Sequence, residues 1–175
     1  MLWQRHLTFP QGLTASEQLI DIAANPVIDA RTAYITTYRG HLAAVSLTNG
    51  RIQWQRPFSS DSGLAVSKSR LYATDSRGVI WAFNCLTGAV LWQQSLLHDR
   101  GLTAPVPCGD SVIVGDREGY LHWFAQQDGR PLARVLVQKR GAIFSSPEVA
   151  YPLTYVVTQQ GKLSAWLLHA TVKPL

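Results

Sequence analysis

The sequence predicts an all-β protein, a β-propeller of four-stranded antiparallel blades with about four blades present. The first observation is a repeat: Gly40, Gly78, Gly119 and Gly161 recur at intervals of 38, 41 and 42 residues, the length of one propeller blade. The second is that short segments rich in Val, Ile, Tyr and Thr alternate with Gly, Asn and Asp, which is typical of strands joined by tight turns. The third is the lack of helical spacing outside one short turn predicted around residues 15–19.

The positions around the four glycines repeat as well. An aliphatic residue follows two positions later, an apolar residue five later, and in the first three units a second glycine ten later. These sets are Leu42, Ile80, Leu121 and Leu163; Val45, Phe83, Phe124 and Trp166; and Gly50, Gly88 and Gly129. Fourteen positions before the first glycine stand Pro26, Pro105 and Pro147, with Leu64 as the exception. Four positions past the second glycine lie Trp54 and Trp92, and Ala133 takes that place in the third unit.

Each unit divides into four strands. In the first unit the pattern predicts strands over residues 26–29, 33–38, 41–47 and 52–56. Asn49-Gly50, Thr87-Gly88 and Asp128-Gly129 place glycine where a hairpin needs positive φ. A four-stranded unit of about 40 residues cannot bury its two faces alone, so neighbouring units must stack, and radial stacking gives a propeller.

The repeat also sets the expected organisation of the chain. We predict a single propeller segment over residues 1–175, in which 24–58, 62–96 and 103–138 are complete blades and 145–168 is an incomplete one. Residues 1–9 are predicted to be the last strand of a preceding blade, and 169–175 a tail. The favoured architecture is part of an eight-bladed ring. The alternative is a closed four-bladed ring, if residues 2–5 pair with the incomplete unit.

Composition narrows the function. A 46% apolar and 15% charged composition describes a packed globular protein. The net charge of +5 comes from scattered basic residues, with Lys139-Arg140 as the one adjacent pair, so nucleic acid is not an expected partner. Apolar stretches are too short for a membrane-spanning helix. No export signal precedes residue 6, so we expect either a cytosolic protein or a sequence whose beginning is missing.

The residues that usually carry chemistry form no reactive constellation. Cys85 and Cys108 lack metal or redox spacing and are expected to be separate buried thiols. The five histidines are widely spread, and no cluster of oxygen ligands stands at calcium-binding spacing. The charged run 116–118 is interpreted as a solvated hairpin turn and His122 as a packed or surface imidazole. We therefore predict a protein that is not an enzyme and holds no cofactor or metal.

Two levels of family resemblance follow from the repeat. The segments 40–54 and 78–92, with their Gly, Leu or Ile, second Gly and Trp, resemble the quinoprotein-type propeller repeat. More specifically, the segment 114–123 (VGDREGYLHW) continuing to Asp128-Gly129-Arg130 looks like the penultimate blade of the BamB family of outer-membrane protein assembly factors. The upstream segments 91–98 and 102–106 match the same family in the same order.

The BamB resemblance implies an eight-bladed propeller that is lipid-anchored to the periplasmic face of the outer membrane, of which this chain supplies the last four blades. It implies a non-enzymatic scaffold that binds the POTRA domains of BamA, with unfolded outer-membrane proteins as possible transient clients. The family's lipidated cysteine and its main BamA-binding loop have no counterpart here. The quinoprotein repeat keeps open the alternative of a PQQ-dependent oxidoreductase fragment.

One partner-binding residue is carried over from the resemblance. The family's acidic Asp-x-Asp contact aligns with residues 21–23, where Asp21 matches and Ala23 does not. Asp21 is therefore the predicted contact with BamA. The alternative interpretation of Asp21 is a solvated loop carboxylate or a helix cap.

Overall fold

The computed structural model describes residues 2–5, 24–37, 40–60 and 62–168. In these residues every regular element is a strand, as predicted, and the fifteen strands form four separate antiparallel sheets. The predicted helical turn at residues 15–19 and the tail after residue 168 lie outside the described residues.

Each sheet is a meander in which consecutive strands pair. The first contains β1 (Val27–Asp29), β2 (Thr32–Thr36), β3 (Gly40–Ser46) and β4 (Ile52–Phe58); the second β5 (Leu64–Ser67), β6 (Arg70–Thr74), β7 (Ile80–Asn84) and β8 (Val90–Gln94). The third contains β9 (Val106–Cys108), β10 (Ser111–Gly115), β11 (Tyr120–Ala125) and β12 (Pro131–Leu136); the fourth β13 (Glu148–Ala150), β14 (Leu153–Val157) and β15 (Leu163–Leu167). The strands of each sheet lie within one of the repeat units proposed from the sequence.

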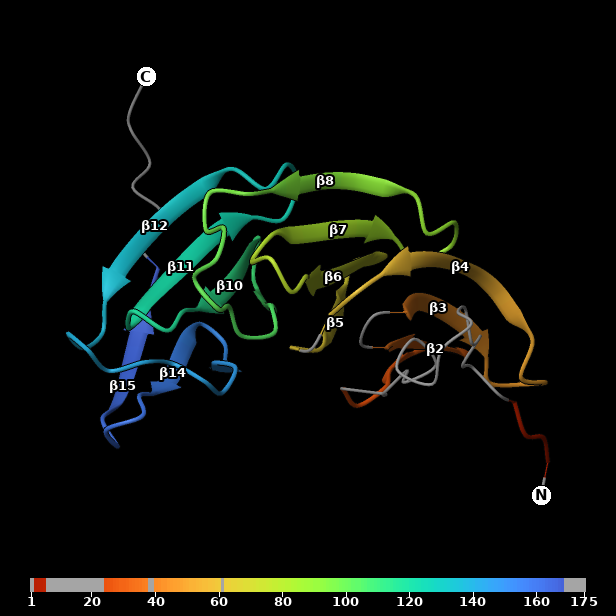
Figure 1. Ribbon diagram of the computed structural model, residues 1–175, viewed down its shortest axis with the longest axis horizontal. Helices are drawn as coiled ribbons and strands as arrows, with labels where there is room; N and C mark the ends of the chain where they lie inside the picture. Colours follow the sequence, from red (N-terminus) through yellow and green to blue (C-terminus); the bar gives the residue numbers. More distant parts are fainter. Residues whose placement is uncertain (1, 6–23, 38–39, 61, 169–175) are drawn as a thin grey trace, which may run out of the picture.

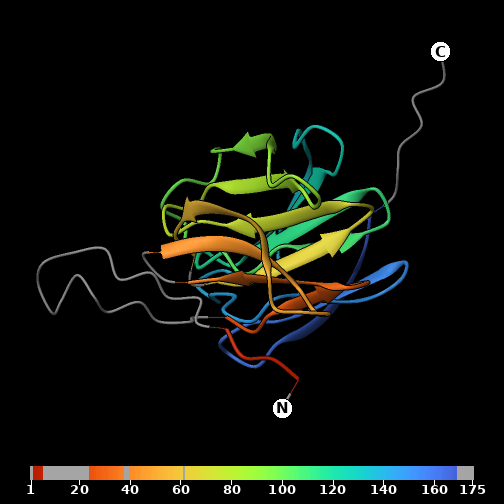
Figure 2. The ribbon, with the colours of Figure 1, turned by 90° about the vertical axis from the view of Figure 1, so that its right-hand side faces the viewer.

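The four sheets stand side by side along an arc (Figure 1), with the first and fourth sheets at its two ends. The outer strands β4, β8 and β12 follow the convex rim, and packing between the inner strands runs from β1 to β5, β9 and β13. Figure 2 views the arc from the end that carries the first sheet. The arc agrees with the prediction of a partial ring and not with the closed four-bladed alternative.

The core lies between the sheets. Each of the three largest apolar clusters draws its residues from two neighbouring sheets. The largest fully buried side chains include Tyr72 and Phe83 of the second sheet and Phe124 of the third. Because successive residues of a strand point to opposite faces, Phe83 packs toward the first sheet while its neighbour Ala82 packs toward the third. Each sheet is therefore stabilised by its neighbours on both sides.

A tryptophan from the outer strand of one sheet docks onto a tight turn of the next. Trp54 on β4 donates its indole N–H to the carbonyl of Cys85, 2.8 Å away, and Trp92 on β8 donates to the carbonyl of Gln126 at 3.0 Å. The ring lies against the glycine of the same turn, since a Cβ at Gly88 would lie 2.6 Å from Trp54. The glycine thus supplies both the turn and the space for the indole.

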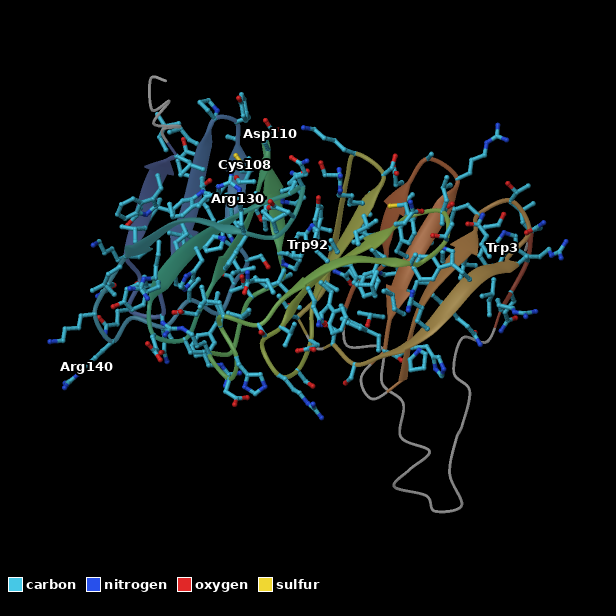
Figure 3. The ribbon with its side chains drawn as sticks, turned by 90° about the horizontal axis from the view of Figure 1, so that it is seen from above. Trp3, Trp92, Cys108, Asp110, Arg130 and Arg140 are labelled. Carbon is cyan, nitrogen blue, oxygen red and sulfur yellow. The ribbon has the colours of Figure 1, made fainter. Side chains whose placement is uncertain are left out.

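Trp3 makes the same contact at the other end of the arc (labelled in Figure 3). Its indole N–H donates to the carbonyl of Leu47 at 2.8 Å, and a Cβ at Gly50 would lie 2.6 Å from its ring. Residues 2–5 are assigned to no strand. The repetition of the contact supports our proposal that residues 1–9 correspond to the last strand of a preceding blade.

The interface between the third and fourth sheets lacks this tryptophan. Ala133 of β12 occupies the position, and the interface is filled by aliphatic side chains, with Val137 and Ile143 buried against Trp166 of β15. Cys85 is buried as expected, whereas the prediction of a second buried thiol is wrong for Cys108, which is half-buried. Cys108 lies on the short edge strand β9, which the turn leaves open to a surface cleft.

The double role of the turn glycine gives a test with an internal control. Gly88 and Gly161 both have positive φ, +68° and +80°, but a Cβ at Gly161 meets nothing within 4 Å. Alanine at either position adds backbone strain of about 1 kcal/mol. Gly88→Ala also drives a methyl into Trp54, so we expect a further loss of about 1–3 kcal/mol. Urea unfolding of both variants measures the difference, and equal losses would contradict the docking role of Gly88.

Candidate partner-binding surface

One face of the arc is formed by the connections between sheets and by the adjoining hairpin turns. We call it the connection face; it comprises residues 59–63, 75–78, 97–104, 116–119, 138–146 and 158–161. Backbone hydrogen bonds join each connection to a turn, as from Asp99 N to Arg77 O at 2.8 Å and from Gln159 N to Ala142 O at 2.8 Å. Arg140 marks this face in Figure 3, and Asp110 marks the opposite one.

The turns of this face are closed by their own first residue. Asp75 Oδ1 accepts hydrogen bonds from the amides of Arg77 and Val79, each 2.9 Å long. Asp116 Oδ1 likewise accepts from Glu118 and Tyr120, at 3.0 and 2.9 Å. A carboxylate three residues before the glycine therefore holds the hairpin turn, as Asp and Asn commonly do.

Asp116 also ties the turn to the neighbouring connections. Its Oδ2 lies 2.7 Å from both Nε and Nη2 of Arg100 and 2.8 Å from His122 Nε2. Its backbone carbonyl accepts from Ile143 at 3.0 Å, and Arg100 also pairs with Glu118 at 2.8 Å. We call Asp116, Arg100, His122 and Glu118 the Asp116 network. It fixes two connections to one hairpin.

The Asp116 carboxylate is ionised in this network. Burial raises the pKa of Asp116, but hydrogen bonds from His122, the Tyr120 amide and Arg100 lower it by more, so the pKa lies below its ordinary value. The prediction of a solvated turn over residues 116–118 is wrong for Asp116, whose exposed fraction is 0%. It holds for Arg117 and Glu118, which are exposed. His122 is packed, one of the two states expected for it, and is buried.

The outer layer of the connection face offers an aromatic and cationic contact surface. Phe144 is 58% exposed, and the guanidinium carbon of Arg117 lies 5.8 Å from the centre of its ring. Both line a cleft of about 220 Å³ with Ser62, Leu102, Thr103 and Ala104. Exposed aromatic rings beside arginine are enriched in protein interfaces. The arrangement is suited to holding another protein.

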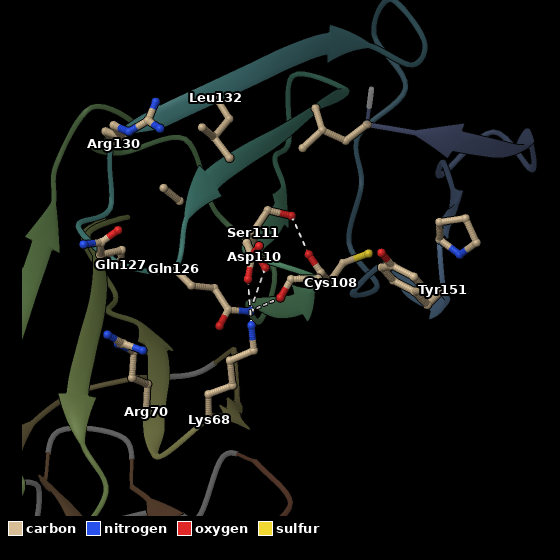
Figure 4. Close-up of a pocket in the computed structure, with 14 residues that line it drawn as sticks. Lys68, Arg70, Cys108, Asp110, Ser111, Gln126, Gln127, Arg130, Leu132 and Tyr151 are labelled. Atoms are coloured by element: carbon tan, nitrogen blue, oxygen red, sulfur yellow. Dashed lines mark hydrogen bonds and ion pairs between the residues drawn. The ribbon is translucent and has the colours of Figure 1, made fainter. Parts of the chain in front are cut away.

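The opposite face holds a wider cleft of about 680 Å³ (Figure 4). Lys68 and Asp110 form an ion pair of 2.7 Å across it, and Lys68 lowers the pKa of Asp110. Gln126 donates its side-chain amide to the carbonyls of Gly109 and Ser111, at 3.3 and 3.0 Å. The ion pair is solvent-exposed and so contributes little to stability.

Asp21, the predicted contact with BamA, lies outside the described residues. The sequence did not single out Arg100, which stands in a connection between two sheets. The signal that could have indicated it is the alternation that buries His122 beside Asp116, because a buried carboxylate needs a charged partner.

Metal and redox chemistry find no constellation in the part of the chain that the structure describes. No group of three His, Cys, Asp or Glu side chains converges there. Cys85 and Cys108 are free thiols in different sheets, and burial raises the pKa of the Cys85 thiol. No helix in these residues has the length and apolar character to cross a membrane.

Comparison with known proteins identifies the family. The family model described as outer membrane protein assembly factor BamB matches residues 1–94 and 76–170. The chain belongs to the BamB family. The BamB of Legionella pneumophila (strain Paris) is 40% identical over 164 residues, which cover 94% of this chain and 42% of that protein. The chain thus spans less than half the length of this relative.

Solved structures agree with the BamB assignment. The crystal structure of BamB from Moraxella catarrhalis has a TM-score of 0.85 at 29% identity, covering 95% of this chain and 49% of that one. The quinohemoprotein alcohol dehydrogenase of Comamonas testosteroni has a TM-score of 0.66 at 17% identity, covering 78% of this chain and 29% of that one. The dehydrogenase likeness shows a shared propeller fold alone.

The Asp116 network predicts a pH-dependent contribution to stability. Asp116→Asn keeps the shape but removes the charge that Arg100 and His122 face, so we expect a loss of about 2–4 kcal/mol at neutral pH. A lowered carboxyl pKa stabilises the fold above the unfolded value of about 3.8 and loses that effect as pH falls through the folded value.

The difference between wild type and Asp116→Asn should therefore be constant from neutral pH to about pH 5 and shrink below about pH 4. Chemical unfolding at a series of pH values measures it. Asp110→Asn is the matched control, since Asp110 also has a lowered pKa but is exposed, and its effect should be small. A difference that persists unchanged into acid would show that Asp116 acts only through its shape.

Proposed function

We propose that this chain is part of a non-enzymatic scaffold subunit of the outer-membrane β-barrel assembly machinery. It binds the POTRA domains of BamA and aids the insertion of outer-membrane proteins, whose unfolded chains are transient clients. The observation that carries the proposal is membership of the BamB family, with the family match running from residue 1 to residue 170. The relatives are named as outer membrane protein assembly factors.

The location follows from the same family. We place the protein at the periplasmic face of the outer membrane, held there by a lipid anchor borne outside these 175 residues. The connection face supports a binding role, because its turns and connections are fixed by hydrogen bonds while Phe144 and Arg117 stay exposed. A rigid loop face that needs little ordering on association favours affinity. Asp21 is proposed as a second contact, in the connection that precedes β1.

Binding to BamA can be tested with matched variants. The POTRA domains of BamA, immobilised for biolayer interferometry, should bind the chain, and Phe144→Ala should weaken binding at least about tenfold if the ring is an interface anchor. Asp21→Ala should weaken it less, as expected for a carboxylate at an interface rim. Tyr151→Ala is the control, because Tyr151 is equally exposed, at 76%, but lines the cleft of the opposite face.

Two outcomes would count against this function. The first is POTRA binding no stronger than that of an unrelated propeller. The second is an equal loss in Phe144→Ala and Tyr151→Ala, which would place the contact elsewhere or make it nonspecific.

The absence of catalysis is a separate proposal with its own measurement. The chain supplied with PQQ and Ca²⁺ should oxidise no primary alcohol, monitored by dye reduction, since its described residues offer no cluster of oxygen ligands. Alcohol-dependent dye reduction above the buffer rate would favour the oxidoreductase alternative.

A further inference from the structure

An apolar groove lies on the convex rim between the second and third sheets. It has a volume of about 330 Å³ and belongs to neither the connection face nor the opposite cleft. We call it the rim groove; it is lined by Leu96, Leu97, Arg100, His122, Phe124, Pro131, Leu132, Ala133 and Arg134. Leu96 and Leu132 are exposed, at 64% and 38%, so apolar surface faces water here.

The corresponding place between the first and second sheets is filled by the chain itself. Trp81 and Phe83 of β7 are stacked, with ring centres 6.0 Å apart and an angle of 6°. The ring of Phe58, from the end of β4, packs edge-on against them, with centres 5.5 Å from Phe83 and 6.2 Å from Trp81. Edge-on packing against a stacked pair is a favoured aromatic geometry.

The repeat places a similar pair in the rim groove without the third ring. His122 and Phe124 hold the repeat positions of Trp81 and Phe83, and their rings are stacked at 6.4 Å with an angle of 22°. Leu96 holds the position of Phe58, but its side chain is exposed while the next residue, Leu97, is buried. The groove therefore presents an aromatic floor that no aromatic side chain of the described residues covers.

The rim of the groove is cationic. Arg134 and Arg100 lie over opposite parts of the groove edge, with guanidinium carbons 5.0 and 5.3 Å from the centre of the Tyr120 ring. The charge of Arg100 is balanced by Asp116 and Glu118. Arg134 is exposed and, within the described part of the chain, makes no ion pair. A ligand with a carboxylate beside its apolar group would match this charge.

We propose that the rim groove binds an acidic peptide segment of another protein through a phenylalanine side chain, seated edge-on against Phe124 as Phe58 is against Phe83. A carboxylate next to the phenylalanine pairs with Arg134. The site adds a second binding surface to the protein and does not depend on the proposed function, because it is defined by the chain's own repeat.

The proposal can be tested on the 175-residue chain with a small probe. The peptide acetyl-Asp-(4-fluorophenylalanine)-Glu-amide is titrated with the protein and followed by ¹⁹F NMR. We expect a saturable change in the fluorine resonance. Leu132→Asn, which makes the wall of the groove polar, should weaken binding at least about tenfold, and Arg134→Gln should weaken it several-fold.

Leu91→Asn is the matched control. Leu91 holds the repeat position of Leu132 on the second sheet and is similarly exposed, at 45%, but its groove already contains Phe58. It should leave the titration unchanged. Leu96→Phe should abolish binding by supplying the missing ring from within, and circular dichroism checks that each variant folds.

Three results would overturn the proposal. One is no fluorine shift with wild type at millimolar protein and peptide. Another is an equal loss in Leu132→Asn and Leu91→Asn. The third is equal binding of a peptide whose two acidic residues are replaced by lysine, which would make the groove a general apolar site and not one for acidic segments.

Discussion

The contact between consecutive sheets is the constraint on which the rest of this structure depends. A four-stranded sheet of about 40 residues exposes two apolar faces, and burying them requires a neighbour on each side. The three largest clusters of buried side chains each combine residues of two sheets. The indole of Trp54 or Trp92 then fixes how one sheet sits on the next, because it hydrogen-bonds a carbonyl of the neighbouring turn.

This dependence explains why the fold was readable from the sequence. A contact that must recur at every interface leaves the same residues at the same offsets, so glycine, proline and tryptophan positions revealed the units before any strand was assigned. The positive φ of Gly50, Gly88 and Gly129 was expected from hairpin chemistry. Their second role, making room for an indole from the preceding sheet, involves residues about 35 positions apart and could not be read from the turn alone.

The binding surfaces were less predictable for the same reason. Residues 116–118 read as a solvated turn because local chemistry describes only the Asx hydrogen bonds. Burial of Asp116 depends on Arg100, which comes from a connection with no repeated pattern. The change from Phe58 to Leu96 is visible in the sequence. The resulting open groove is not, since it depends on Leu97 turning inward in place of Leu96.

Departures from the repeat are therefore the most informative positions in the chain. Equivalent strands share one backbone geometry, so a position that differs between units is not explained by the fold alone. His122 is such a position, standing where the second sheet has Trp81, and Asp75 Oδ2 accepts the Trp81 indole N–H at 2.9 Å just as Asp116 Oδ2 contacts His122. The imidazole keeps the carboxylate contact but occupies less of the groove than an indole does. The single exchange thus opens the rim groove while preserving the Asp116 network, and His122 and Arg100 belong to both sites.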